Sequence, residues 1–167
     1  MSNATAEALN TLEALNKHLR RRKSPDRLWL TEAYVRQVHR DMFKDVSSEA
    51  GSYRYTEDHR GVSPQTIREE IRKLCEDLVY WNSSGMPVLE RAVHLHHRLT
   101  RIRPFEHGNG RLARLMADIL LFSYRHPLPV WPTEITQEQY VEALQAADQG
   151  DFKPLVAFTK RYLLPEE

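Results

Sequence analysis

The sequence predicts a mainly helical, all-α fold in a single domain. Apolar residues recur at three- and four-residue spacing along most of the chain, which is the pattern of helices with one buried face. The 167 residues match the usual length of one domain. Hydrophobic residues make up 41% and charged residues 28% of the sequence, a balance that excludes disordered and fibrous proteins.

Three helices are expected in the first half of the chain. The first covers residues 1–22, where leucines recur at helical spacing up to a Ser-Pro break. The second follows Thr31, a good N-cap residue, and the third covers residues 64–81. Between them, residues 51–61 lack a helical period and carry alternating aromatics, which indicates a loop or a short β-hairpin.

Four more helices are expected in the second half, over residues 87–102, 111–124, 136–148 and 154–164. The first of these opens on a proline, which suits the first turn of a helix. The helix over residues 111–124 has the strongest apolar stripe in the chain. Three prolines between residues 127 and 132 predict an extended connection to the next helix.

Charge and targeting signals predict a cytoplasmic protein that acts neither on membranes nor, in general, on nucleic acid. The formal net charge is +1, whereas general nucleic-acid binders carry a strongly basic face. The basic run Arg20–Lys23 is expected to be a solvated helix end, with DNA binding as the weaker alternative. No signal peptide or membrane-length apolar run is found, and the one cysteine, Cys75, fits a reducing compartment.

The chemistry concentrates in the loop before the helix 111–124. Gly108, Asn109 and Gly110 precede a helix start, so backbone N–H groups and the positive end of the helix dipole meet at one place. Arg111 and Arg114 are three residues apart and share a face of that helix. Because guanidinium groups match phosphate oxygens in pairs, the segment predicts a phosphate-binding site.

The same segment resembles the signature of the Fic (Fic/Doc) family of the Fido fold, His-Pro-Phe-x-(Asp or Glu)-Gly-Asn-Gly-Arg-x-x-Arg. Residues 103–114 read Arg-Pro-Phe-Glu-His-Gly-Asn-Gly-Arg-Leu-Ala-Arg and agree with it at all but two positions. The preceding helix and the segment 140–155 are also similar to the family. The resemblance implies an N-terminal helical extension over residues 1–25 and a compact Fic-like domain over residues 26–167.

The resemblance implies a protein adenylyltransferase, which transfers AMP from ATP to a hydroxyl group of a target protein with Mg²⁺. The glycine-rich loop and the two arginines described above would hold the ATP phosphates, and Phe105 would anchor the loop on the core. Residues 51–62 stand where the family has a β-hairpin flap that docks the target. Tyr53, Tyr55 and Thr56 would there pair with an extended target segment.

Two departures from the motif bear on activity. Arg103 stands where the family has its general base, a histidine, and arginine does not release its proton near neutral pH. His107 stands where the family has the carboxylate that binds Mg²⁺, and a neutral imidazole is a poor ligand for that ion. We therefore expect a nucleotide site whose transferase activity is lost or strongly reduced. Glu106, one position away, is the alternative metal ligand.

Three interpretations compete at this point. The chain is an adenylyltransferase scaffold with impaired chemistry, or a non-catalytic nucleotide- or anion-binding regulatory or interaction module. The weakest is a DNA-associated protein. Family members are often restrained by an inhibitory helix or an antitoxin-like partner protein, and the pattern of that helix, (Ser or Thr)-x-x-x-Glu-(Gly or Asn), is absent from the chain. His94 and His97 share a helix face, but no third ligand accompanies them, so buried structural roles are expected.

Overall fold

The all-α prediction is confirmed by a computed structural model, which describes residues 2–20, 29–131 and 137–163. These residues form seven α-helices, one short 3-10 helix and no β-strand. The elements are α1 (Asn3–Arg20), α2 (Glu32–Phe43), η1 (Pro64–Thr66), α3 (Ile67–Ser83), α4 (Val88–Ile102), α5 (Asn109–Ser123), α6 (Gln137–Asp148) and α7 (Lys153–Lys160). No described helix is both long and apolar enough to cross a bilayer.

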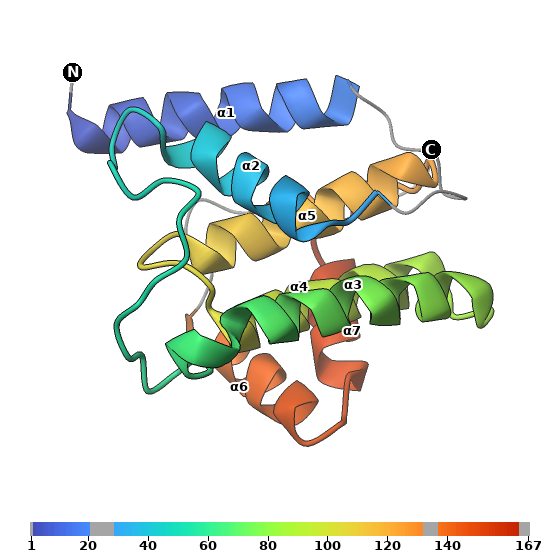
Figure 1. Cartoon of the computed structure of the whole chain (residues 1–167). Coiled ribbons are helices and arrows are strands. Elements are labelled where there is room, and N and C mark those ends of the chain that lie inside the picture. The colour runs from blue at the N-terminus through green and yellow to red at the C-terminus, as the bar shows by residue number, and fades with distance from the viewer. Residues whose placement is uncertain (1, 21–28, 132–136, 164–167) are drawn as a thin grey trace.

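The helices stack around a central pair, α4 and α5, which pack against each other along their length. Figure 1 shows α1 and α2 above α5, α3 beside α4, and α6 and α7 at the lower edge. α1 packs on both α2 and α5 and contributes Ala14 to the main core. The predicted boundary between extension and domain, at residue 25, falls outside the described residues, as do Thr136 and most of the basic run.

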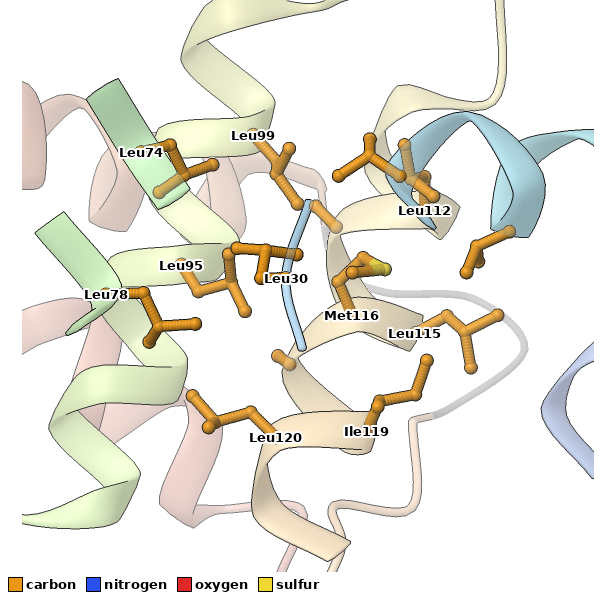
Figure 2. Close-up of a cluster of buried hydrophobic side chains, with 14 of the residues drawn as sticks. Leu30, Leu74, Leu78, Leu95, Leu99, Leu112, Leu115, Met116, Ile119 and Leu120 are labelled. Carbon is orange, nitrogen blue, oxygen red and sulfur yellow. The ribbon is translucent and has the colours of Figure 1, made fainter. Parts of the chain in front are cut away.

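The core explains why α5 is the strongest helix in the sequence pattern. Apolar side chains of α5 point in several directions because other helices cover the helix on most sides. Figure 2 shows Leu112, Met116 and Leu120 of α5 among leucines of α3 and α4. A smaller apolar cluster holds α6 and α7 against α4, and its members are Val93, Ala143, Ala147, Leu155 and Phe158.

Several helix ends follow from local sequence chemistry. The side chain of Thr31 accepts a hydrogen bond from the Tyr34 amide at 3.1 Å, as expected for the N-cap of α2. Pro87 precedes the first residue of α4 rather than being that residue. α4 ends where Arg103 adopts a left-handed conformation, with φ of 49°. α5 begins at Asn109, two residues earlier than expected.

The possible β-hairpin over residues 51–61 is not formed. Its backbone pairs with the loop after α4 instead: the Arg54 amide donates to Pro104 O at 2.9 Å, and the Val62 amide to Ile102 O at 3.3 Å. Arg54 is 3% exposed, and its guanidinium donates to the carbonyl oxygens of Thr56, Val62, Ile102 and Arg103. A buried arginine therefore satisfies the acceptors that a second strand would have paired.

We predict that Arg54→Lys loosens residues 52–62, because an ammonium group cannot reach four carbonyl oxygens in the plane of a guanidinium. Buried acceptors that lose their donors should lower the free energy of unfolding by about 2–4 kcal/mol. Hydrogen exchange should show faster exchange of the amides of this segment. Arg60→Lys, on an exposed side chain of the same segment, is the control, and equal exchange in both variants would contradict the account.

Candidate functional site

The candidate site is the loop 103–108 together with the first turn of α5. Asn109 shapes this loop from inside. Its side chain is 2% exposed, its Oδ1 accepts from the Phe105 amide at 3.0 Å, and its Nδ2 donates to Phe105 O at 2.8 Å. The Asn109 side chain is thus committed to the loop itself. No side chain caps the start of α5, so the first backbone N–H groups of this helix have no side-chain partner and could bind a ligand.

His39 of α2 fixes the loop from the other side. Its ring stacks on Phe105, with centroids 3.7 Å apart and planes 9° apart, and Phe105 is fully buried. His39 Nδ1 accepts from the Gly51 amide at 2.9 Å, and Nε2 donates to His107 O at 3.0 Å. Burial lowers the pKa of His39 to about 4, so the ring is neutral at pH 7 with its proton on Nε2.

Gly108 can be only glycine at its place in the loop. Its φ is 78°, a conformation that residues with a Cβ rarely adopt. A Cβ built on it would lie 2.2 Å from the Phe43 ring. The absence of a side chain lets the loop pack closely against Phe43 of α2.

The two predicted phosphate-binding arginines flank this helix start. Arg111 is half-exposed, lies over the Phe43 ring at 5.1 Å and forms an ion pair with Glu7 of α1. The Nη1 atom of Arg114 lies 3.5 Å from the point that a Cβ on Gly110 would occupy, so its guanidinium lies beside the first turn of α5. Glu7 was not predicted as part of the site, because no spacing in the sequence relates it to the motif.

Arg103 is bound to the segment 51–62 rather than free in the site. Its Nε donates to Asp58 Oδ2 at 2.8 Å, and both side chains are largely buried. Although burial opposes it, hydrogen bonds from Arg103 and Arg60 hold the pKa of Asp58 well below its usual range. Glu106 is likewise engaged, since Thr56 Oγ1 donates to its carboxylate at 2.6 Å.

These contacts leave fewer polar groups of the predicted docking residues available to a target segment. Thr56 uses its hydroxyl for Glu106, and the Tyr53 ring packs against Phe105 with its hydroxyl buried. Tyr55 and Thr56 are both exposed, Tyr55 with 77% of its surface. Their role in docking a target stays a prediction.

The metal position offers Mg²⁺ one poor ligand and one engaged carboxylate. His107 supplies an imidazole, and Glu106 accepts a hydrogen bond from Thr56. The described residues contain no group of three or more side chains that could hold a metal ion by themselves, and the loss of Mg²⁺ binding stays a prediction. His94 and His97 also lack a shared ligand position. His94 stacks on Phe152 at 3.7 Å, and His97 pairs with Asp148 at 2.7 Å.

The sequence profile of the Fic/DOC family matches residues 29–121. The protein adenylyltransferase Fic of Nematostella vectensis is 32% identical over 130 residues, which are 75% of this chain and 30% of that protein. The protein adenylyltransferase fic-1 of Caenorhabditis elegans is 29% identical over 133 residues, 77% of this chain and 26% of that protein. The chain therefore spans less than a third of the length of these curated relatives.

Solved structures agree in fold. Residues 134–508 of Fic-1 from C. elegans superpose with a TM-score of 0.77 and 25% identity, over 91% of this chain and 46% of that chain. The N-terminal Fic domain of a Bartonella quintana effector superposes with a TM-score of 0.75 and 19% identity, over 98% of this chain and 83% of that chain.

We predict that His39→Phe keeps the ring stack but leaves the Gly51 amide and His107 O without partners. The free energy of unfolding at pH 7 should fall by about 2–3 kcal/mol. The His39 pKa is lower in the folded chain than the ordinary 6.5, so its contribution is complete above pH 6.5 and is lost as the pH falls through about 4. The stability gap between parent and variant, measured by denaturant unfolding, should therefore shrink from pH 7 to pH 4.

The control for this prediction is His59→Gln, at an exposed histidine in the segment 51–62. It should change stability by less than about 0.5 kcal/mol at either pH. A gap between parent and His39→Phe that stays constant across the pH range would contradict the neutral, doubly bonded state of His39.

Proposed function

The chain belongs to the Fic/DOC family, and we propose that it binds the phosphate groups of ATP as a protein adenylyltransferase scaffold whose transfer chemistry is lost or strongly reduced. The observation that carries this proposal is the contrast between two ends of one loop. At the start of α5, the backbone has no side-chain cap and two arginines lie close by, one of them paired with Glu7. At the end of α4, Arg103 takes the place of the base and is tied to Asp58.

Phosphate binding draws on three sources of positive potential at the same place. The first turn of α5 supplies backbone N–H groups and the positive end of the helix dipole. Arg111 and Arg114 add two permanent charges that donate in pairs. Asn109 and His39 hold the loop in shape before a ligand arrives, so little ordering entropy is lost on binding.

Deprotonation of a target hydroxyl has no candidate base at the motif position. Arg103 keeps its proton at any physiological pH. His39 is the nearest buried imidazole of the loop, but both of its nitrogens are already hydrogen-bonded and it has no open face toward a substrate. Loss of a positioned base typically costs about a hundred- to ten-thousandfold in rate. The proposed acceptor, a hydroxyl group on a target protein, would therefore be modified slowly or not at all.

A second candidate function is a non-catalytic regulatory or interaction module that senses nucleotide. The contacts of the segment 51–62 favour it, because Asp58, Thr56 and Arg54 hold this segment against the loop 103–108 from three directions. A segment fixed in this way presents a constant surface, which suits recognition by a partner protein, inhibitory or otherwise. Measured turnover distinguishes this candidate from a slow transferase.

We predict that isothermal titration calorimetry detects ATP binding that does not depend on Mg²⁺. Arg111→Ala and Arg114→Ala should each weaken it about 10- to 100-fold, since each removes a charge-assisted contact of about 1.5–3 kcal/mol. Arg68→Ala, on the exposed surface of α3, is the matched control and should leave the affinity unchanged. Equal affinity in all four proteins would contradict the proposed phosphate site.

Glu7 competes with phosphate for Arg111, and we predict that Glu7→Gln raises ATP affinity about three- to tenfold. The carboxylate already occupies part of the Arg111 guanidinium, so a phosphate oxygen must displace it. The control is Glu13→Gln, which removes the same charge elsewhere on α1. Glu13 is exposed, and its ion pair is with Lys44 at 3.9 Å, not with an arginine of the site. The ion pair is irrelevant to binding if both variants raise the affinity equally, because general electrostatics then explains the gain.

A further inference from the structure

Arg111 is held by two side chains of different chemistry, a carboxylate and an aromatic ring. Its guanidinium carbon lies over the ring of Phe43 on α2, 5.1 Å from the ring centroid, and its Nη1 pairs with Glu7 of α1. Figure 1 shows the end of α2, the start of α5 and the first half of α1 on the same side of the molecule. Both contacts therefore come from the packing of other helices against α5, not from spacing within α5.

The two contacts differ in what they leave for a ligand. The face of an aromatic ring attracts a cation through its quadrupole and offers no oxygen atom. A guanidinium has five N–H donors, so a contact with an aromatic face leaves donors for other acceptors. A carboxylate, in contrast, occupies the donors that a phosphate oxygen would use. A phosphate therefore has to displace Glu7 from Arg111, whereas it can bind while Phe43 stays in place.

The ring of Phe43 also sets where the guanidinium lies relative to the loop. A Cβ on Gly108 would lie 2.2 Å from Cζ and 2.5 Å from Cε2 of this ring, so the tip of the ring meets the residue just before α5. One ring thus has Gly108 at its tip and the Arg111 guanidinium over its face. This contact keeps the guanidinium close to the uncapped start of α5.

Phe43 can hold a cation in place because the ring is itself fixed. It is 1% exposed and belongs to the main core. The His39 ring packs on it with centroids 4.6 Å apart, and the same His39 ring stacks on Phe105 at 3.7 Å. Burial lowers the pKa of His39 to about 4, so at neutral pH this row of rings adds no second cation beside Arg111.

Arg111 needs such a support because its side chain is 42% exposed. A long side chain at the surface populates several rotamers, and a ligand that fixes it must supply the lost entropy. Glu7 restrains the side chain only until an anion takes its place, whereas the contact with Phe43 persists during that exchange. Order that exists before binding need not be supplied by the ligand.

We propose that Phe43 is a positioning residue that keeps the guanidinium of Arg111 beside the start of α5, so that the face of its ring contributes to the phosphate affinity of the site. Glu7 and Phe43 then act in opposite directions, because loss of the carboxylate raises the affinity and loss of the aromatic face lowers it. The effect on affinity rests on the proposed nucleotide function, whereas the order of the Arg111 side chain without ligand does not.

The test needs variants that separate the charge distribution of the ring from its packing. Phe43→Leu removes the aromatic face but also leaves space beside Gly108. In place of Phe43, 2,6-difluorophenylalanine keeps the shape of the ring, carries its fluorines on the two Cδ atoms, and makes the face less attractive to a cation. The atoms nearest to Gly108, Cζ and the two Cε atoms, are unchanged. The same fluorinated residue in place of Phe122, which is 37% exposed on α5, is the matched control.

The first measurement uses the Glu7→Gln chain without ligand, because the carboxylate then no longer restrains Arg111. The ¹⁵N heteronuclear NOE of the arginine Nε–H groups reports side-chain order, and the resonance that disappears in Arg111→Lys belongs to Arg111. Phe43→Leu and the fluorinated ring at position 43 should both lower the NOE of this resonance. The fluorinated ring at position 122 should not. An NOE of Arg111 that is unchanged by the fluorinated ring at position 43 overturns the proposal.

The second measurement is a double-mutant cycle on ATP affinity. The fluorinated ring at position 43 should weaken binding about two- to fivefold in the parent chain, and should have no further effect in Arg111→Ala. In Arg114→Ala, which keeps Arg111, the same loss should remain. An equal loss in the parent and in Arg111→Ala would mean that the ring acts through the loop alone, and would overturn the proposal. ATP binding by the parent chain tests the proposed function, and the NOE of Arg111 tests the positioning, so the two can fail separately.

Discussion

The candidate site depends on one buried imidazole. His39 joins three segments that are far apart in the sequence: α2, the turn at Gly51 and the loop 103–108. It does so only as a neutral ring, because one nitrogen must accept from an amide while the other donates to a carbonyl oxygen. Burial keeps it neutral and also makes its two bonds obligatory. His39 therefore stabilises the loop 103–108 and the segment 51–62 against the core at the same time. The shape of the candidate site does not depend on a ligand.

A single substitution relative to the family motif has two physical consequences. On the proposed function, Arg103 would remove the general base, and its ion pair with Asp58 holds the segment 51–62 against the loop. Arg54 stabilises the same contact between the segment 51–62 and the loop, because its guanidinium donates to four carbonyl oxygens of the two segments. The contacts of Arg103 and Arg54 do not involve the start of α5, because Arg111 and Arg114 follow the loop in sequence. The proposed function therefore separates the phosphate-binding residues from the position of the base within about ten residues of sequence.

Local patterns predicted most of the helices, because apolar spacing, the cap at Thr31 and the prolines act over a few residues. The hairpin was wrong because Arg54, a polar residue that a local pattern assigns to the surface, is buried by contacts with the distant loop at Ile102 and Arg103. Long-range contacts also explain what the sequence could not predict in the site. The pairing of Glu7 with Arg111 and the contact of Phe43 with the same arginine depend on how α1 and α2 pack, and no spacing encodes that. The helical spacing of His39 with Val35 and Met42 was a usable signal that this histidine faces the core.

The central claim is that a Fic scaffold here keeps its phosphate site and has lost its transfer chemistry at two positions. The most direct test is transfer of label from ATP carrying its tag on the α-phosphate to proteins of a cell lysate, with Mg²⁺. The unchanged chain would be compared with the double variant Arg103→His, His107→Asp, after thermal melts show that both are folded. The account predicts labelled proteins with the double variant and little or none with the unchanged chain. Equal labelling by the two proteins, or none by the double variant, would contradict it.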